Sequence, residues 1–130
     1  MREYLVKERN RYYLPKAVYY QALYAVRDYD RLRSEYAEVL AGSVGVAGDG
    51  QPSGSRIARP TQRKGEKLAE ISEKIAAIER ALAEIPDEYQ KAVFENVKDC
   101  APYPYIASLP TWSRWRRRFL YHVAKNLRLW

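Results

Sequence analysis

Apolar side chains recur at helical spacing along most of this chain. From Pro15 to Gly42 they follow alternating steps of four and three, and proline suits the first turn of a helix. The spacing therefore predicts one helix of about 25 residues in this stretch. Its apolar positions are Val18, Ala22, Ala25, Tyr29, Leu32, Tyr36 and Val39.

A second long helix is predicted to begin at Pro60 and Thr61, and it carries the most regular apolar seam in the sequence. The seam consists of Leu68, Ile71, Ile75, Ile78, Leu82 and Ile85. Two seams of similar length most simply face each other in an antiparallel helical hairpin. The same seams also suit a dimeric coiled coil, so a homodimer stays open as an alternative.

The stretch between these helices, residues 41–60, lacks helical or strand periodicity. It holds five of the six glycines, which is typical of a flexible Gly-rich loop. Its glycines do not precede the Gly-Lys-Ser/Thr sequence of a phosphate-binding loop. We therefore expect a flexible connection and no nucleotide site there.

The end of the chain has a different plan. Pro86 and the two acids after it predict the start of a short helix that ends near Lys98. Three prolines lie in residues 100–110, which predicts a turn with one helical turn at 104–108. Thr111 is then expected to cap a last helix that runs to Trp130.

The chain is thus predicted to be all-α. We expect a long antiparallel helical hairpin in residues 1–85, with the flexible loop at 41–60, followed by a C-terminal helix-turn-helix in residues 86–130.

Charge is concentrated in the last predicted helix. Residues 111–130 hold six of the 23 Lys and Arg and no acid, whereas the other 110 residues carry 17 basic and 16 acidic groups. The formal net charge of +7 is therefore almost local. On a helical wheel the cations lie opposite an apolar side that contains Trp112, Phe119 and Val123, and Arg116 projects toward that apolar side.

A short helix, a turn and a final helix with a cationic outer face form the plan of a helix-turn-helix, in which the last helix enters the major groove of double-stranded DNA. Ser113, Arg114, Arg117 and Arg118 are then nearest the bases, since Arg can donate to both acceptors of guanine. Tyr121, Lys125 and Arg128 lie further along and are expected to reach phosphates.

Enzymatic and metal chemistry are not predicted. One His (His122) and one Cys (Cys100) supply no nucleophile with a base, and no set of zinc ligands. We expect no enzyme, no cofactor and no metal. A single cysteine also suits a reducing cytoplasm, and neither a signal peptide nor a membrane span is predicted.

Several segments resemble RinA-type phage transcriptional regulators, whose C-terminal segment is similar to sigma factor region 4. The segments are IPDEYQKAVFENV, the later Tyr103-Pro104 pair and TWSRWRRRFLYHVAKNL; the front half of the family is similar to LPKAVYYQALYAVRDYDRL. The resemblance implies promoter binding, activation of phage late genes and contact with RNA polymerase. The stretch between Val97 and Thr111 departs from the family, because it is short and proline-rich for the middle helix of region 4.

Two other functions remain open. A DNA-packaging recognition subunit would share the basic helix but assemble into a ring. A coiled-coil adaptor would use the long helices as an interaction surface and would bind a partner or an anionic membrane with its last helix.

Overall fold

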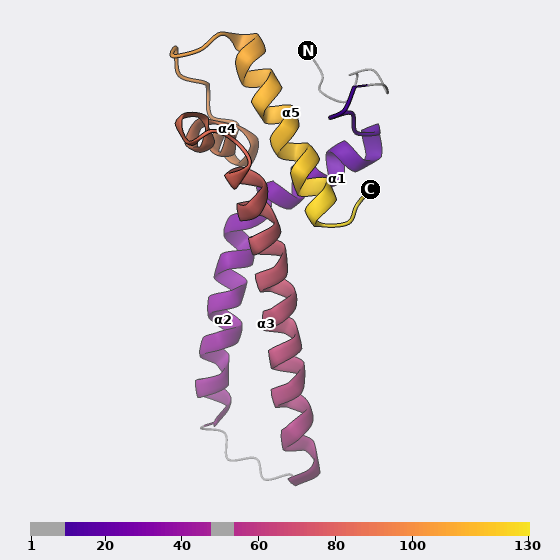
Figure 1. Cartoon of the computed structure of the whole chain (residues 1–130). Coiled ribbons are helices and arrows are strands. Elements are labelled where there is room, and N and C mark those ends of the chain that lie inside the picture. Colours follow the sequence, from indigo (N-terminus) through magenta and orange to yellow (C-terminus); the bar gives the residue numbers. More distant parts are fainter. Residues whose placement is uncertain (1–9, 48–53) are drawn as a thin grey trace. The chain divides into compact units, whose positions relative to one another are not determined.

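The computed structural model describes residues 10–47 and 54–130 of the chain, and the side chains of these residues except 43–47 and 54–61. This part of the chain contains five helices and no strand, so the all-α prediction is confirmed (Figure 1). The helices are α1 (Lys16–Arg27), α2 (Tyr29–Ala47), α3 (Gly54–Ala83), α4 (Asp87–Asp99) and α5 (Leu109–Asn126).

The helices form two compact units. The first unit combines the chain up to Tyr29 with Ala77–Trp130, and the second consists of Asp30–Ala76. This division does not follow the expected boundary at residue 85, because α1 belongs with α4 and α5. The assignment of residues 86–130 as a separate DNA-binding segment stays a prediction.

The first long helix of the prediction is interrupted at Asp28. Helix α1 ends at Arg27, and α2 begins at Tyr29. The Asp28 N–H lies 3.1 Å from the Tyr24 carbonyl oxygen and 3.2 Å from that of Ala25, so the hydrogen-bond ladder tightens there. The apolar positions keep their spacing across this point, so the periodicity of the sequence does not indicate the interruption.

The expected loop at 41–60 is largely helical, which corrects the prediction. Helix α2 continues to Ala47, and α3 begins at Gly54, before Pro60. Residues 48–53, the rest of the expected loop, lie outside the described part of the chain. Glycine lowers helix stability by about 1 kcal/mol relative to alanine, a cost that a long helix can absorb.

The core of the first unit lies where α1, α4 and α5 pack against one another (Figure 1). Helix α1 supplies Val18, Ala22 and Val26, and α4 supplies Val93 and Val97. The α5 residues in this core are Trp112, Phe119, Leu120, Val123 and Ala124, each no more than 1% exposed. Burying each of the larger side chains contributes about 1.5 to 3 kcal/mol, so this core holds α5 in place.

In the second unit, α2 lies beside α3 (Figure 1). The Lys64 ammonium donates to the Leu40 carbonyl oxygen at 3.2 Å, and Lys67 forms an ion pair with Glu35 at 3.9 Å. Ile71 of the predicted seam is 3% exposed, whereas Leu68 and Ile75 are half-buried.

Both ends of α5 differ from the prediction. Ser108, and not Thr111, is the residue that precedes the helix, and Pro110 lies inside the first turn. The hydroxyl groups of Ser108 and Thr111 are 3.0 Å apart. The helix ends at Asn126, so Arg128 lies beyond it in the left-handed region, with φ of 58°.

Candidate nucleic-acid interface

The cationic side of α5 faces away from the core of the first unit. Arg114 and Lys125 are exposed near its two ends. The other helical candidates, Ser113, Arg117, Arg118 and Tyr121, are half-buried. Arg128 is also exposed, but it comes after the last residue of α5 and so does not lie on a face of the helix. The structure therefore brings six of the seven predicted residues onto one helix and separates the seventh from it.

Arg116 lies on the opposite side of α5, as its wheel position predicts. Its Nη1 donates to the Tyr19 hydroxyl of α1 at 2.6 Å, and its Nε donates to Asn96 Oδ1 of α4 at 3.1 Å. The guanidinium thus links α5 to both neighbouring helices. Arg116 is a structural residue, and its charge is not offered to a ligand on the outer face.

The proline-rich connection before α5 is held by specific contacts. It runs from Cys100, which has φ of 60°, to Ser108. Asn96 Nδ2 donates to the Ala101 carbonyl oxygen at 2.7 Å, and Trp112 Nε1 donates to that of Pro104 at 3.2 Å. The Tyr103 ring stacks on Trp112 at 5.0 Å. These contacts fix where α5 begins.

The same connection contains no helical turn at 104–108, which corrects the prediction. Tyr105 and Ile106 form a turn with exposed side chains, and Leu109 is exposed at the start of α5. The connection is longer than the turn of about three or four residues that joins the helices of a typical helix-turn-helix.

The segment before α1 crosses the cationic side of α5, and the sequence did not indicate this. The Arg118 guanidinium carbon lies 4.6 Å from the ring centre of Tyr12 and 4.9 Å from that of Trp115. Tyr12 also meets Tyr121 edge to face at 5.3 Å. Tyr12 and Trp115 are therefore site residues that sequence reasoning missed.

Lys125 makes the corresponding contacts at the far end of the face. Its ammonium lies 4.6 Å from the Trp130 ring centre and 5.5 Å from that of Tyr121. It also reaches the Trp130 carbonyl oxygen at 3.5 Å. Lys125 and Arg118 are thus both cations that lie against aromatic rings. The attraction between a cation and an aromatic ring contributes about 0.5 to 2 kcal/mol.

His122 lies at the margin of the cationic side, where Tyr12 and Tyr121 meet it edge to face. Burial is the main cause that lowers the pKa of its imidazole, and the charges of Arg11 and Arg118 lower it further, while Glu84 acts in the opposite direction. Within the described residues, no three His, Cys, Asp or Glu side chains gather in a way that could hold a metal ion.

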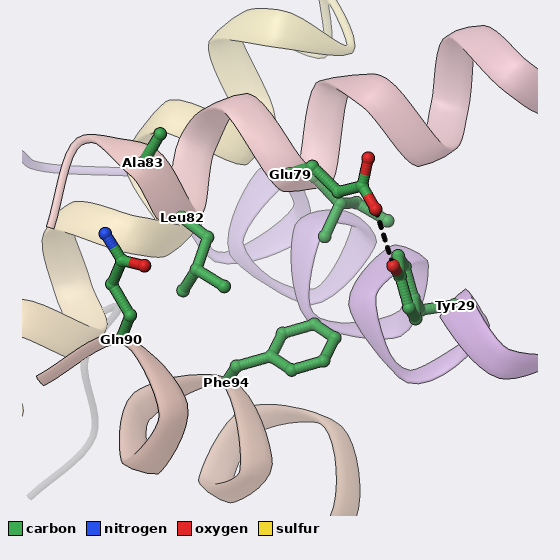
Figure 2. Close-up of a pocket in the computed structure, with 7 residues that line it drawn as sticks. Tyr29, Glu79, Leu82, Ala83, Gln90 and Phe94 are labelled. Atoms are coloured by element: carbon green, nitrogen blue, oxygen red, sulfur yellow. Dashed lines mark hydrogen bonds between the residues drawn. The ribbon is translucent and has the colours of Figure 1, made fainter. Parts of the chain in front are cut away.

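A small pocket of about 190 Å³ lies elsewhere in the first unit (Figure 2). The Tyr29 hydroxyl donates to Glu79 Oε2 at 2.7 Å on one side of it, and the other lining residues are Ile78, Leu82, Ala83, Gln90 and Phe94. None of the predicted DNA-binding residues lines this pocket.

In the part of the chain that the structure describes, no helix has the length and apolar character needed to cross a membrane.

The comparisons with known proteins return no relative. No family model matches the chain, no curated protein matches it, and no solved structure matches it. The resemblance to RinA-type regulators therefore stays a prediction.

Proposed function

We propose that this protein binds double-stranded DNA with the cationic side of α5 and regulates transcription. One observation carries the proposal: α5 is fixed by five core residues, while Arg114, Arg117, Arg118 and Lys125 lie on its other side without any acidic residue in the helix. A fixed helix with such a face suits the phosphate backbone and base edges of a groove.

On this proposal, α4, the connection and α5 act as a helix-turn-helix variant. Arg114 and Ser113 lie in the early turns of α5, from which side chains of a recognition helix reach base edges. Tyr121 and Lys125 lie nearer its other end, where phosphate contacts fit better. Arg128 follows the helix and would add charge beside them.

The biological role comes from the resemblance and not from the fold. A RinA-type regulator would bind a promoter of phage or prophage DNA, activate late genes and contact RNA polymerase. The second unit would then form the antiparallel hairpin, and its half-buried seam residues Tyr36, Val39, Leu68 and Ile75 also suit pairing with a second copy.

The test is a footprint on the DNA that surrounds the gene, followed by titration of the protected fragment and of random DNA at several salt concentrations. We expect log K to fall with log salt by about 0.9 per phosphate neutralised. Arg114→Ala should reduce discrimination between the two DNAs by about 1 to 3 kcal/mol, whereas Lys125→Ala should weaken both equally.

Arg63→Ala is the matched control, because Arg63 is an exposed cation of α3 in the second unit and is not part of the proposed helix-turn-helix. If the footprint shows no protected fragment and the protein binds all DNA sequences with equal affinity, the protein does not regulate a specific promoter and that part of the proposal is wrong. Light scattering distinguishes the alternatives, since a ring indicates a packaging subunit, and a dimer that does not bind DNA indicates an adaptor.

A further inference from the structure

Two aromatic rings from different parts of the chain fix the position of Arg118. Trp115 lies one turn earlier on α5 and stacks on Tyr89 of α4 at 5.6 Å, with 23° between the ring planes. Tyr12 comes from the segment before α1. With the guanidinium carbon within 5 Å of both ring centres, Arg118 lies against rings that are themselves anchored.

The Tyr12 side of this arrangement is anchored by its own segment. The Tyr12 N–H donates to Asn10 Oδ1 at 2.8 Å, and the Tyr13 N–H donates to the Asn10 carbonyl oxygen at 3.0 Å. Leu14 follows and is only 2% exposed, which ties the segment to the core. The Tyr12 ring is therefore held in place by local hydrogen bonds and by a neighbouring buried residue.

We propose that Tyr12 is a positioning residue that holds Arg118 as a phosphate-binding group, so that Arg118 fixes the register of α5 on DNA and does not read bases. This inference depends on the proposed DNA binding. The Arg118 Nε is buried, so its terminal N–H groups are the donors for an acceptor, and phosphate oxygens accept such donors well.

The contrast with Arg114 supports this assignment. Arg114 is exposed, four residues earlier on the same face, whereas Arg118 is half-buried beside Tyr12 and Trp115. A side chain held close to its own helix is suited to the backbone at the groove edge, and an exposed one can extend toward the bases. An arginine that is already ordered also loses less conformational entropy when it binds.

The experiment measures binding of the full chain to a fluorescein-labelled random-sequence duplex, because a phosphate contact needs no operator. We expect Tyr12→Ala to weaken binding by about 2- to 10-fold with an unchanged salt slope, since the charge is retained. Arg118→Ala should also weaken binding, and it should reduce the slope by about 0.9. Tyr12→Phe should bind like the wild type, because the ring is kept.

Tyr24→Ala is the matched control. Tyr24 is an exposed tyrosine of α1 whose ring contacts Tyr20 and Arg27, and its loss should leave DNA binding unchanged. Arg118→Lys provides a second route if Tyr12→Ala fails to fold; it should lower affinity without changing the slope. The Arg118 Nε–H signal in NMR should exchange slowly with solvent in the wild type and Tyr12→Phe, and faster in Tyr12→Ala.

Two failures can be told apart. If the wild type shows no salt-dependent binding to duplex DNA, the proposed function is wrong and this inference falls with it. If the wild type binds but Tyr12→Ala binds equally well or more tightly, or if Tyr24→Ala weakens binding as much, then Tyr12 does not position Arg118. Tighter binding by Tyr12→Ala would instead indicate that Tyr12 hinders the access of DNA to the cationic side of α5.

Discussion

Substitution of Arg116 tests whether this cation of α5 stabilises the fold, in contrast to the cations on the outer face of the helix. In Arg116→Ala, α5 loses hydrogen bonds of 2.6 Å to Tyr19 and 3.1 Å to Asn96. A hydrogen bond from a charged donor contributes about 1.5 to 3 kcal/mol. Because the guanidinium is only half-buried, we expect a loss of about 2 to 4 kcal/mol for the two bonds together.

The assay is thermal or urea unfolding followed by tryptophan fluorescence. All three tryptophans lie in the first unit, so the signal reports that unit alone. For a unit of this size, the expected loss lowers Tm by at least about 8 °C. Arg114→Ala is the control, since it removes the same charge from an exposed site of the same helix and should change stability by less than about 0.5 kcal/mol.

A double-mutant cycle with Tyr19→Phe makes the test sharper. If the Arg116 to Tyr19 bond stabilises the fold, the two substitutions should be coupled by about 0.5 kcal/mol or more. Equal stability of Arg116→Ala and Arg114→Ala would refute the view that Arg116 links the three helices.

Three further predictions concern stability. Phe119→Ala should cost about 3 to 5 kcal/mol in urea unfolding, because Phe119 is 0% exposed; a cost below about 1 kcal/mol would contradict the described core. Gly42→Ala and Gly65→Ala should each increase helicity by circular dichroism and stabilise their helices by up to about 1 kcal/mol, since an added Cβ meets nothing within 4 Å; a loss would contradict the helical assignment. Burial lowers the pKa of His122 from 6.5, so the neutral imidazole contributes to the free energy of unfolding fully above pH 6.5, and this contribution is lost as the pH falls below that value. The measurement compares the urea midpoints of the wild type and His122→Gln across this pH range. Parallel profiles of the two proteins would contradict the prediction.

Sequence periodicity predicted the orientation of α5 well and its limits less well. The spacing placed Trp112, Phe119 and Val123 on the buried side and directed Arg116 toward it, because a helical wheel depends only on the phase of the pattern. The end at Asn126 and the start after Ser108 were missed. These boundaries depend on hydrogen bonds of single residues, which a repeating pattern does not contain.

The long-range contacts could not be predicted from spacing. Tyr12 and Arg118 lie far apart in sequence, and twelve tyrosines gave no reason to prefer one of them. The helical ends near residues 47 and 54 were missed for a different reason: glycine weakens a helix without forbidding it, so its count predicts a tendency and not a boundary.

The division of the first unit between the two parts of the chain has a consequence for synthesis. Helix α1 ends at Arg27, but its partner α5 is complete only at Asn126, about a hundred residues later. Because synthesis adds about 5 to 20 residues per second, the apolar side of α1 lacks that partner for about 5 to 20 s while the chain is still on the ribosome. The second unit is contiguous in sequence and can form in the interval, so the part that closes last is the one that carries the proposed DNA-binding face.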